Sequence, residues 1–105
     1  MSNERNENVV TVEKSENENS VVSVDLTSLP LSQIARIINK DWLKINYAAR
    51  PYLNAMYSLT SVTDDYGMDS GISIVLYFIS NASSWRGEVT KSVKAELKRR
   101  TAEYR

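Results

Sequence analysis

The sequence predicts an all-α fold: a compact bundle of three to four short helices that follows an acidic tail. Two observations lead to this. From Leu26 onward, apolar residues recur at three- and four-residue spacing, which is the period of an amphipathic helix. Before Leu26 the chain is rich in Asn, Glu and Ser, a composition that favours disorder. At 105 residues it is long enough for one small core, so we expect a tail over residues 1–25 and a helical domain over residues 26–105.

Within the tail, two short Val-rich segments form a near-repeat. Val9–Glu13 (VVTVE) is echoed by Val21–Asp25 (VVSVD), and β-branched residues favour extended structure. The segments could pair as a short hairpin through residues 14–19, although an isolated hairpin is only marginally stable in water. A largely disordered tail with a possible β-hairpin is therefore the expectation.

The first two helices are expected on either side of residue 46. Ser28 is a candidate N-cap with Pro30 in the first turn, and an apolar stripe follows at Ile34, Ile37, Ile38, Trp42 and Ile45. A second helix should begin near Tyr47 with Pro51 near its start, and its stripe is Ala49, Tyr52, Leu53, Met56 and Leu59. Pro51 disfavours helical geometry at Arg50, so one kinked helix and two separate helices both remain open.

The rear half of the chain should hold a loop and two more helices. Residues 63–71 read as a polar loop, and Asp69 or Ser70 would cap the next helix. Residues 72–80 are the most apolar piece, which we interpret as a helix rather than a buried strand. The last helix should be capped by Ser84 and carry Glu88 in its first turn, where a negative charge suits the helix dipole. Its apolar face is expected to hold Trp85, Val89, Val93, Leu97 and Tyr104.

The absence of histidine and cysteine argues against an enzyme and against thiolate metal sites. Asp41 and Tyr66 could be tuned for proton transfer, but nothing places them opposite a second catalytic group. Asp64, Asp65 and Asp69 lack the spacing of a calcium loop, so turn formation explains them better. We expect a non-enzymatic protein with no cofactor and no metal.

Charge is sorted along the chain although the formal net charge is zero. Residues 1–25 carry six acids against two bases, and residues 85–105 carry seven bases against three acids. A basic face on the last helix, with an arginine at its start, is the candidate nucleic-acid contact: Arg86, Lys91, Lys94, Lys98 and Arg105. A solvated outer helix face is the alternative, and neutral net charge favours that alternative.

Other residues point to a protein partner instead. Each Val-rich segment is similar to a SUMO-interacting motif, which adds as a strand to the edge of another protein's sheet. The favoured alternative is a solubilising linker, or strands that pair with each other. Tyrosines near the ends of elements are candidate interface anchors. The candidate partner-binding residues are Val9, Val10, Val12, Val21, Val22, Val24, Tyr57, Tyr66 and Tyr104.

Four segments together carry a resemblance to a known group. They are residues 50–56 (RPYLNAM), 64–71 (DDYGMDSG), 80–87 (SNASSWRG) and 94–97 (KAEL). The stretch over about residues 40–100 resembles short helical proteins of unknown function carried by actinobacterial and similar phages and plasmids. The resemblance implies a mobile-element origin and a compact helical domain, and it brings no activity with it.

The expected function is binding of a macromolecular partner, most simply another protein, by an accessory factor. A small nucleic-acid-binding protein that uses the last helix is the second hypothesis. No targeting segment is visible and the longest apolar run is too short to span a bilayer. We therefore expect a cytoplasmic protein with no membrane partner.

Overall fold

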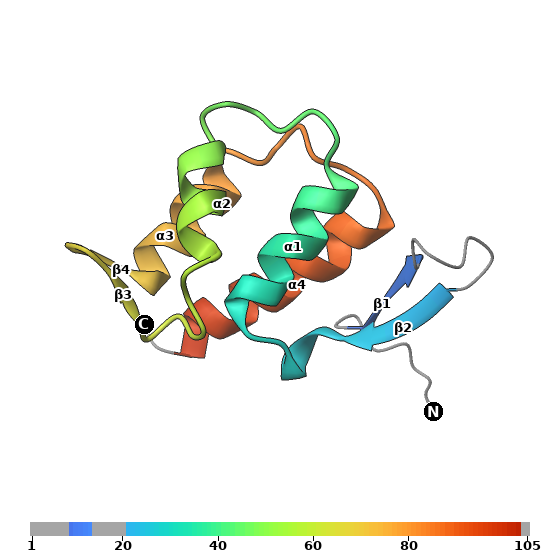
Figure 1. Ribbon diagram of the computed structural model, residues 1–105, viewed down its shortest axis with the longest axis horizontal. Coiled ribbons are helices and arrows are strands. Elements are labelled where there is room, and N and C mark those ends of the chain that lie inside the picture. The colour runs from blue at the N-terminus through green and yellow to red at the C-terminus, as the bar shows by residue number, and fades with distance from the viewer. Residues whose placement is uncertain (1–8, 14–20, 104–105) are drawn as a thin grey trace.

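A computed structural model of the chain describes residues 9–13 and 21–103. Four α-helices form the body: α1 (Leu31–Asp41), α2 (Arg50–Met56), α3 (Gly71–Ser80) and α4 (Glu88–Glu103). A 3-10 turn, η1 (Leu26–Ser28), precedes them. In Figure 1, α1 and α4 lie side by side in one half of the body, and α2 and α3 lie side by side in the other. The helical core that the periodicity predicts is confirmed, and α1 and α2 are separate helices.

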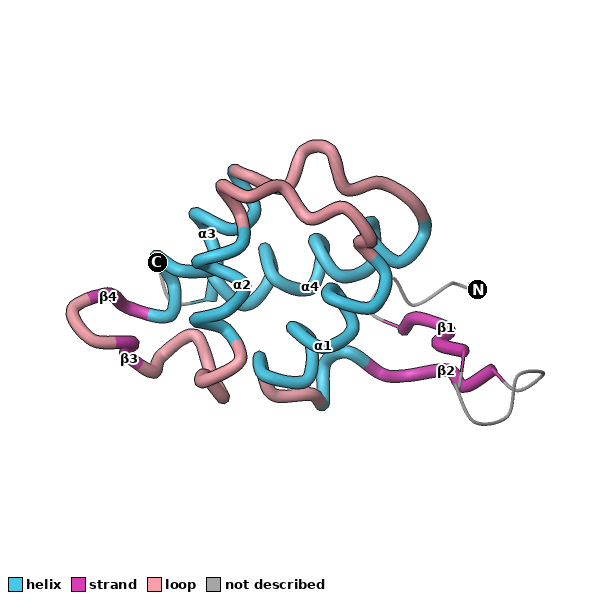
Figure 2. The backbone as a smooth tube through the Cα atoms, turned by 45° about the horizontal axis from the view of Figure 1, so that its top comes forward, coloured by secondary structure: helices cyan, strands magenta, loops and turns pink. Residues whose placement is uncertain are grey.

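The fold is mostly helical rather than all-α, because the two Val-rich segments are strands. β1 (Val9–Glu13) and β2 (Val21–Asp25) pair antiparallel, with Val9 opposite Asp25 and Glu13 opposite Val21. A shorter antiparallel pair, β3 (Asp65–Tyr66) and β4 (Asp69–Ser70), lies in the loop before α3. Figure 2 shows the two strand pairs at opposite ends of the helical body. The predicted pairing of the two Val-rich segments is therefore confirmed. The disorder was predicted for residues 1–8 and 14–19, which lie outside the described residues.

Three predicted helix starts are corrected. α2 begins at Arg50 rather than near Tyr47, because residues 47–49 form a turn before it. Ser28 lies in η1, where its hydroxyl donates to the Asp25 carbonyl at 2.9 Å, so it does not cap α1. The first amides of α1 instead donate to backbone carbonyls of the loop after α2: Leu31 N to Thr60 O and Ser32 N to Leu59 O, both at 2.9 Å. Backbone carbonyls from another segment thus accept the hydrogen bonds that a side-chain cap usually accepts.

The last helix also starts later than expected. It begins at Glu88 rather than after Ser84, because Gly87 turns the chain with φ +125°, a conformation that favours glycine. Trp85 consequently precedes α4 and packs from the loop. By contrast, Ser70 caps α3 as predicted, since its hydroxyl accepts a hydrogen bond from Ser73 N at 3.1 Å. The helical interpretation of residues 72–80 is confirmed.

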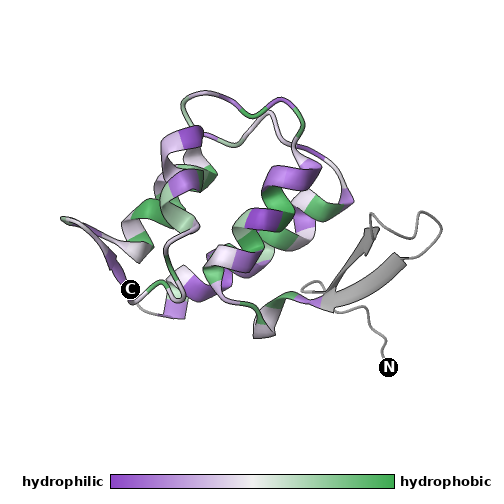
Figure 3. Cartoon of the chain, in the orientation of Figure 1, coloured by the Kyte–Doolittle hydropathy of each residue, from purple (hydrophilic) through white to green (hydrophobic). Residues whose placement is uncertain are grey.

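The core fills the space between the four helices. On α1, hydrophobic and hydrophilic positions alternate around the helix (Figure 3), and the buried ones are Leu31, Ile34, Ala35 and Ile38. At one end of the core Trp42 stacks on Trp85, with ring centroids 5.8 Å apart, and Phe78 packs edge-on against both rings. Two long loops, residues 42–49 and 81–87, run close together over this end (Figure 1).

Candidate functional site

A shallow groove runs between the loop before α4 and the outer face of α4. Most of the cations of the predicted basic face line it. We call it the basic groove, and the residues that line it are Ser83, Trp85, Arg86, Gly87, Glu88, Thr90, Lys91, Lys94, Ala95 and Lys98. The four cations that line the groove were therefore all predicted from the sequence. The fifth predicted contact, Arg105, lies outside the described residues.

Three of these cations face solvent. Arg86, Lys91 and Lys98 are exposed, and among the side chains described, those of residues 25–103, none forms an ion pair with them. Glu88 is the one carboxylate that lines the groove. The groove therefore presents positive charge that the described part of the fold does not neutralise, which attracts anions over a range of about one Debye length.

Lys94 is held differently from its neighbours. Its half-buried ammonium donates to the Ala82 carbonyl at 2.7 Å, which ties α4 to the loop that follows α3. Burial, followed by the charges of Lys98 and Arg86, lowers the pKa of Lys94 below its ordinary value. This shift has the direction expected where several cations crowd one site without a neutralising anion.

The wall of the groove is fixed by the aromatic core. Trp85 is buried, and its indole Nε1 donates to Asp41 Oδ2 at the end of α1 at 2.8 Å. Because the same ring stacks on Trp42, the loop that carries Arg86 is anchored on two sides. Asp41, a candidate for proton transfer by sequence, thus accepts the hydrogen bond that anchors this wall.

Thr90 is the unusual residue of the groove. It is 4% exposed, and its hydroxyl has no hydrogen-bond partner among the residues that the structure describes. A buried hydroxyl without a partner costs about 1–3 kcal/mol. Its burial was not predictable from sequence, because a threonine in the first turn of an amphipathic helix resembles a neutral surface residue.

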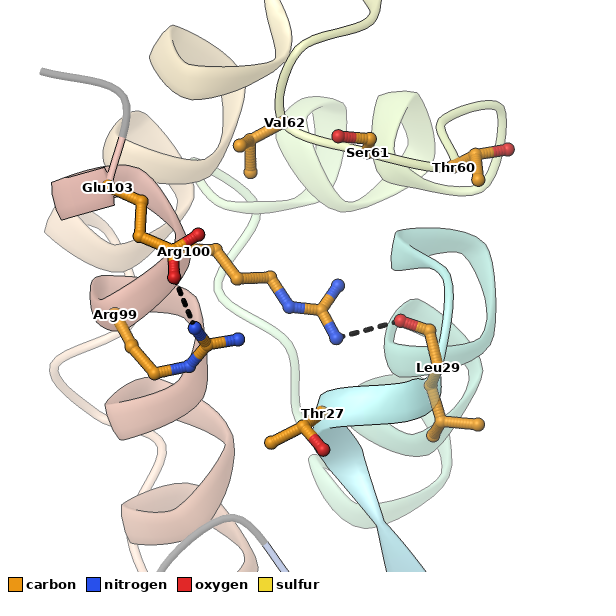
Figure 4. A pocket seen from close by; sticks show the side chains of 8 residues that line it. All are labelled: Thr27, Leu29, Thr60, Ser61, Val62, Arg99, Arg100 and Glu103. Atoms are coloured by element: carbon orange, nitrogen blue, oxygen red, sulfur yellow. Dashed lines mark hydrogen bonds and ion pairs between the residues drawn. The ribbon is translucent and has the colours of Figure 1, made fainter.

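A second hollow lies near the C-terminal end of α4, and the charged residues around it have a structural role. Figure 4 shows Arg99 and Arg100 reaching from α4 toward Glu103 and toward the Leu29 carbonyl. Glu96 is fully buried, and its carboxylate accepts hydrogen bonds from Arg99 Nε (3.0 Å), Arg99 Nη2 (2.7 Å) and Arg100 Nε (2.5 Å). These two arginines are therefore not free for a partner in the way that Lys91 and Lys98 are.

The network joins α4 to the chain entry. Arg100 Nη2 donates to the Leu26 and Leu29 carbonyls at 2.6 and 2.7 Å, which links α4 to η1 and to the segment before α1. Burial would raise the pKa of Glu96, but the hydrogen bonds and charges of Arg99 and Arg100 outweigh burial and hold that pKa below its usual value. The hydrogen bond to Glu96, assisted by the charge of that carboxylate, raises the pKa of Arg99 above its ordinary value. The i, i+3 and i+4 spacing of Glu96, Arg99 and Arg100 was the available sequence signal.

The predicted partner-binding residues are scattered. Val9, Val10 and Val12 lie in β1, and Val21, Val22 and Val24 lie in β2, so the two segments pair with each other. Tyr57 is half-buried against the core, Tyr66 is 46% exposed in β3, and Tyr104 lies outside the described residues. Large exposed side chains that the sequence did not single out are Leu43, Tyr47, Met68 and Tyr77.

The acidic loop before α3 is used for turn formation. Asp64 Oδ2 accepts hydrogen bonds from Thr60 N at 2.9 Å and Ser61 N at 3.0 Å, which lowers the pKa of this carboxyl. The described residues hold no group of three or more acids that could surround a metal ion. The Asp64 contacts are those that a turn-forming carboxylate makes.

Comparison with known proteins adds no relative. No family model, no curated protein and no solved structure matches this chain. The resemblance to short phage and plasmid proteins stays a prediction. Among the described residues, no helix has the length and apolar character needed to cross a membrane.

Proposed function

We propose that this protein is a non-enzymatic binding protein whose partner is a nucleic acid, held by its phosphate backbone in the basic groove. The proposal rests on the exposed cations Arg86, Lys91 and Lys98, which form no ion pair with the side chains of residues 25–103. Phosphate contacts by lysine and arginine supply most of the affinity of sequence-independent nucleic-acid binding.

The spacing of the lysines suits a repeating anion. Lys91, Lys94 and Lys98 follow one another at i, i+3 and i+7, so they share one face of α4. At 1.5 Å per residue this face extends about 10 Å, which is the axial rise of about three phosphates on one strand. A row of lysines contacts phosphates without reading bases, so we expect weak sequence preference.

Replacing Lys91, Lys94 and Lys98 together with glutamine should reduce affinity for duplex DNA at least about tenfold at low salt and lower the salt slope by about three. Fluorescence anisotropy with a labelled duplex measures both. The matched control is Lys40→Gln with Lys44→Gln, since these lysines are exposed but lie outside the groove. Equal losses in the two variants would contradict a specific role for the groove.

A protein partner is the second candidate, and the strand pair supports it. β1 and β2 form a sheet of two strands, so each strand has one edge without a strand partner among the described residues. Such edges accept an added strand from another chain.

Deletion of residues 1–25 separates the two candidates. Under the proposed function the shortened chain should bind DNA at least as tightly, because six acids are removed with two bases. Under strand addition the same deletion should abolish capture of the partner. A deleted chain that folds, by circular dichroism, but loses DNA binding would contradict the groove as the sole DNA contact.

A further inference from the structure

The unpartnered hydroxyl of Thr90 distinguishes one part of the basic groove from the rest. Buried polar groups in folded proteins nearly always have a hydrogen-bond partner, so a buried hydroxyl without one calls for an explanation. Thr90 lines the groove and is 4% exposed. A ligand oxygen at this place would supply the missing partner.

Lys94 lies one helical turn after Thr90. Both residues line the basic groove, and their i, i+4 spacing places them on the same face of α4. The Lys94 ammonium donates to the Ala82 carbonyl at 2.7 Å, which holds it beside the loop before α4. Both side chains therefore belong to the lining that a ligand in the groove would meet.

The charges around this place favour a compact anion. Arg86 and Lys91 line the same groove as Thr90, and both are exposed. The first turn of α4 adds the positive end of the helix dipole. The carboxylate of Glu88 repels an anion at this place. An anion with several acceptor oxygens gains more from these donors than one with a single oxygen, and this offsets the repulsion.

We propose that Thr90, Lys94 and Arg86, which line the same groove, form a phosphate subsite near the start of α4. On entry of a phosphate group, the Lys94 ammonium exchanges the Ala82 carbonyl for a phosphate oxygen, and the Thr90 hydroxyl donates to a second oxygen. Only hydrogen bonds change: no covalent bond is made or broken, and the proton of the Thr90 hydroxyl stays on its oxygen. This inference rests on the proposed function and specifies which point of the groove grips a single phosphate.

The test replaces Thr90 with valine, which has the same shape without the hydroxyl. In the full chain, isothermal titration with inorganic phosphate should show binding, and Thr90→Val should weaken it about tenfold. Thr90→Ser, which keeps a hydroxyl, should retain affinity within about threefold. Glu88→Gln should strengthen binding, because it removes the opposing charge. The denaturation midpoint of Thr90→Val should not fall, since the hydroxyl it removes has no hydrogen-bond partner in the described part of the chain.

The outcomes separate this inference from the proposed function. Unchanged phosphate affinity in Thr90→Val, or a marked fall in its stability, overturns the subsite, even if the lysine triple variant loses DNA. Phosphate binding that depends on Thr90, without any duplex binding, supports the subsite and makes a free phosphate or phosphomonoester its source. Competition of phosphate with duplex DNA, lost in Thr90→Val, supports the subsite as part of the nucleic-acid surface.

Discussion

Glu96→Gln should lower the free energy of unfolding by about 3 kcal/mol, because it removes the charge that pairs with Arg99 and Arg100 in a buried site. Glu96 is fully buried, whereas Arg99 retains 41% exposure, so water compensates part of the loss at Arg99. Arg100 is 12% exposed and holds two backbone carbonyls near the chain entry. Most of the loss in the free energy of unfolding should therefore come from the unpaired charge of Arg100.

Urea denaturation followed by circular dichroism measures this change. The matched control is Glu103→Gln, which removes an exposed partner of the same Arg99 and should cost less than about 1 kcal/mol. Similar losses in both variants would show that Glu96 acts as an ordinary surface pair, which would contradict the structural role assigned to the network.

The same network gives stability a pH dependence. The pKa of Glu96 in the folded state lies below its ordinary value of 4.5, so the unfolded state takes up the proton first. The stabilising contribution of Glu96 is therefore complete above pH 4.5 and is lost as the pH falls through the folded-state pKa. Asp64 contributes in the same direction, because its pKa is also lowered. Glu96→Gln should flatten the decline of the denaturation midpoint below pH 4.5 without abolishing it.

Trp85→Ala should cost roughly 3–5 kcal/mol, the usual range for removing a buried aromatic ring from a core. The ring stacks on Trp42, contacts Phe78 and donates to Asp41, so its removal leaves a cavity and frees the wall of the basic groove. DNA affinity should fall in the same variant under conditions in which it stays folded, because Arg86 is the next residue in the chain.

Thermal unfolding with binding at a temperature well below the midpoint separates the two effects. Asp41→Asn keeps an oxygen acceptor for the indole and should change stability by less than about 0.5 kcal/mol. A Trp85→Ala protein that is as stable as the original chain would contradict the position of this ring in the core.

The helical body was predictable because its signals are local. The apolar periodicity of residues 31–41 and the position of Pro51 at the start of α2 are read from neighbouring residues. Ser70 was predictable for the same reason, since a cap bonds to an amide three residues away. The cap at Ser28 failed because carbonyls of Leu59 and Thr60, about thirty residues away in the sequence, satisfy the amides that Ser28 would have served.

The site was predictable in its charges but not in its contacts. The helical spacing of Lys91, Lys94 and Lys98 placed them on one face. Only the tertiary structure shows that Lys94 donates to the Ala82 carbonyl and that the Thr90 hydroxyl has no hydrogen-bond partner among the residues described. The burial of Glu96 was hidden as well, because hydropathy assigns every glutamate to the surface, and only the two arginines one turn later make its burial tolerable.

The most direct test of nucleic-acid binding is a titration of the full chain against labelled duplex and single-stranded DNA between about 50 and 200 mM salt. We predict binding at low salt that weakens by about two orders of magnitude over this range, as expected for about four phosphate contacts. In the variant with Lys91, Lys94 and Lys98 replaced by glutamine, most of that salt dependence should be gone. Absence of binding to either DNA at the lowest salt would contradict nucleic-acid binding in the basic groove. It would favour a protein partner at the pair of strands β1 and β2.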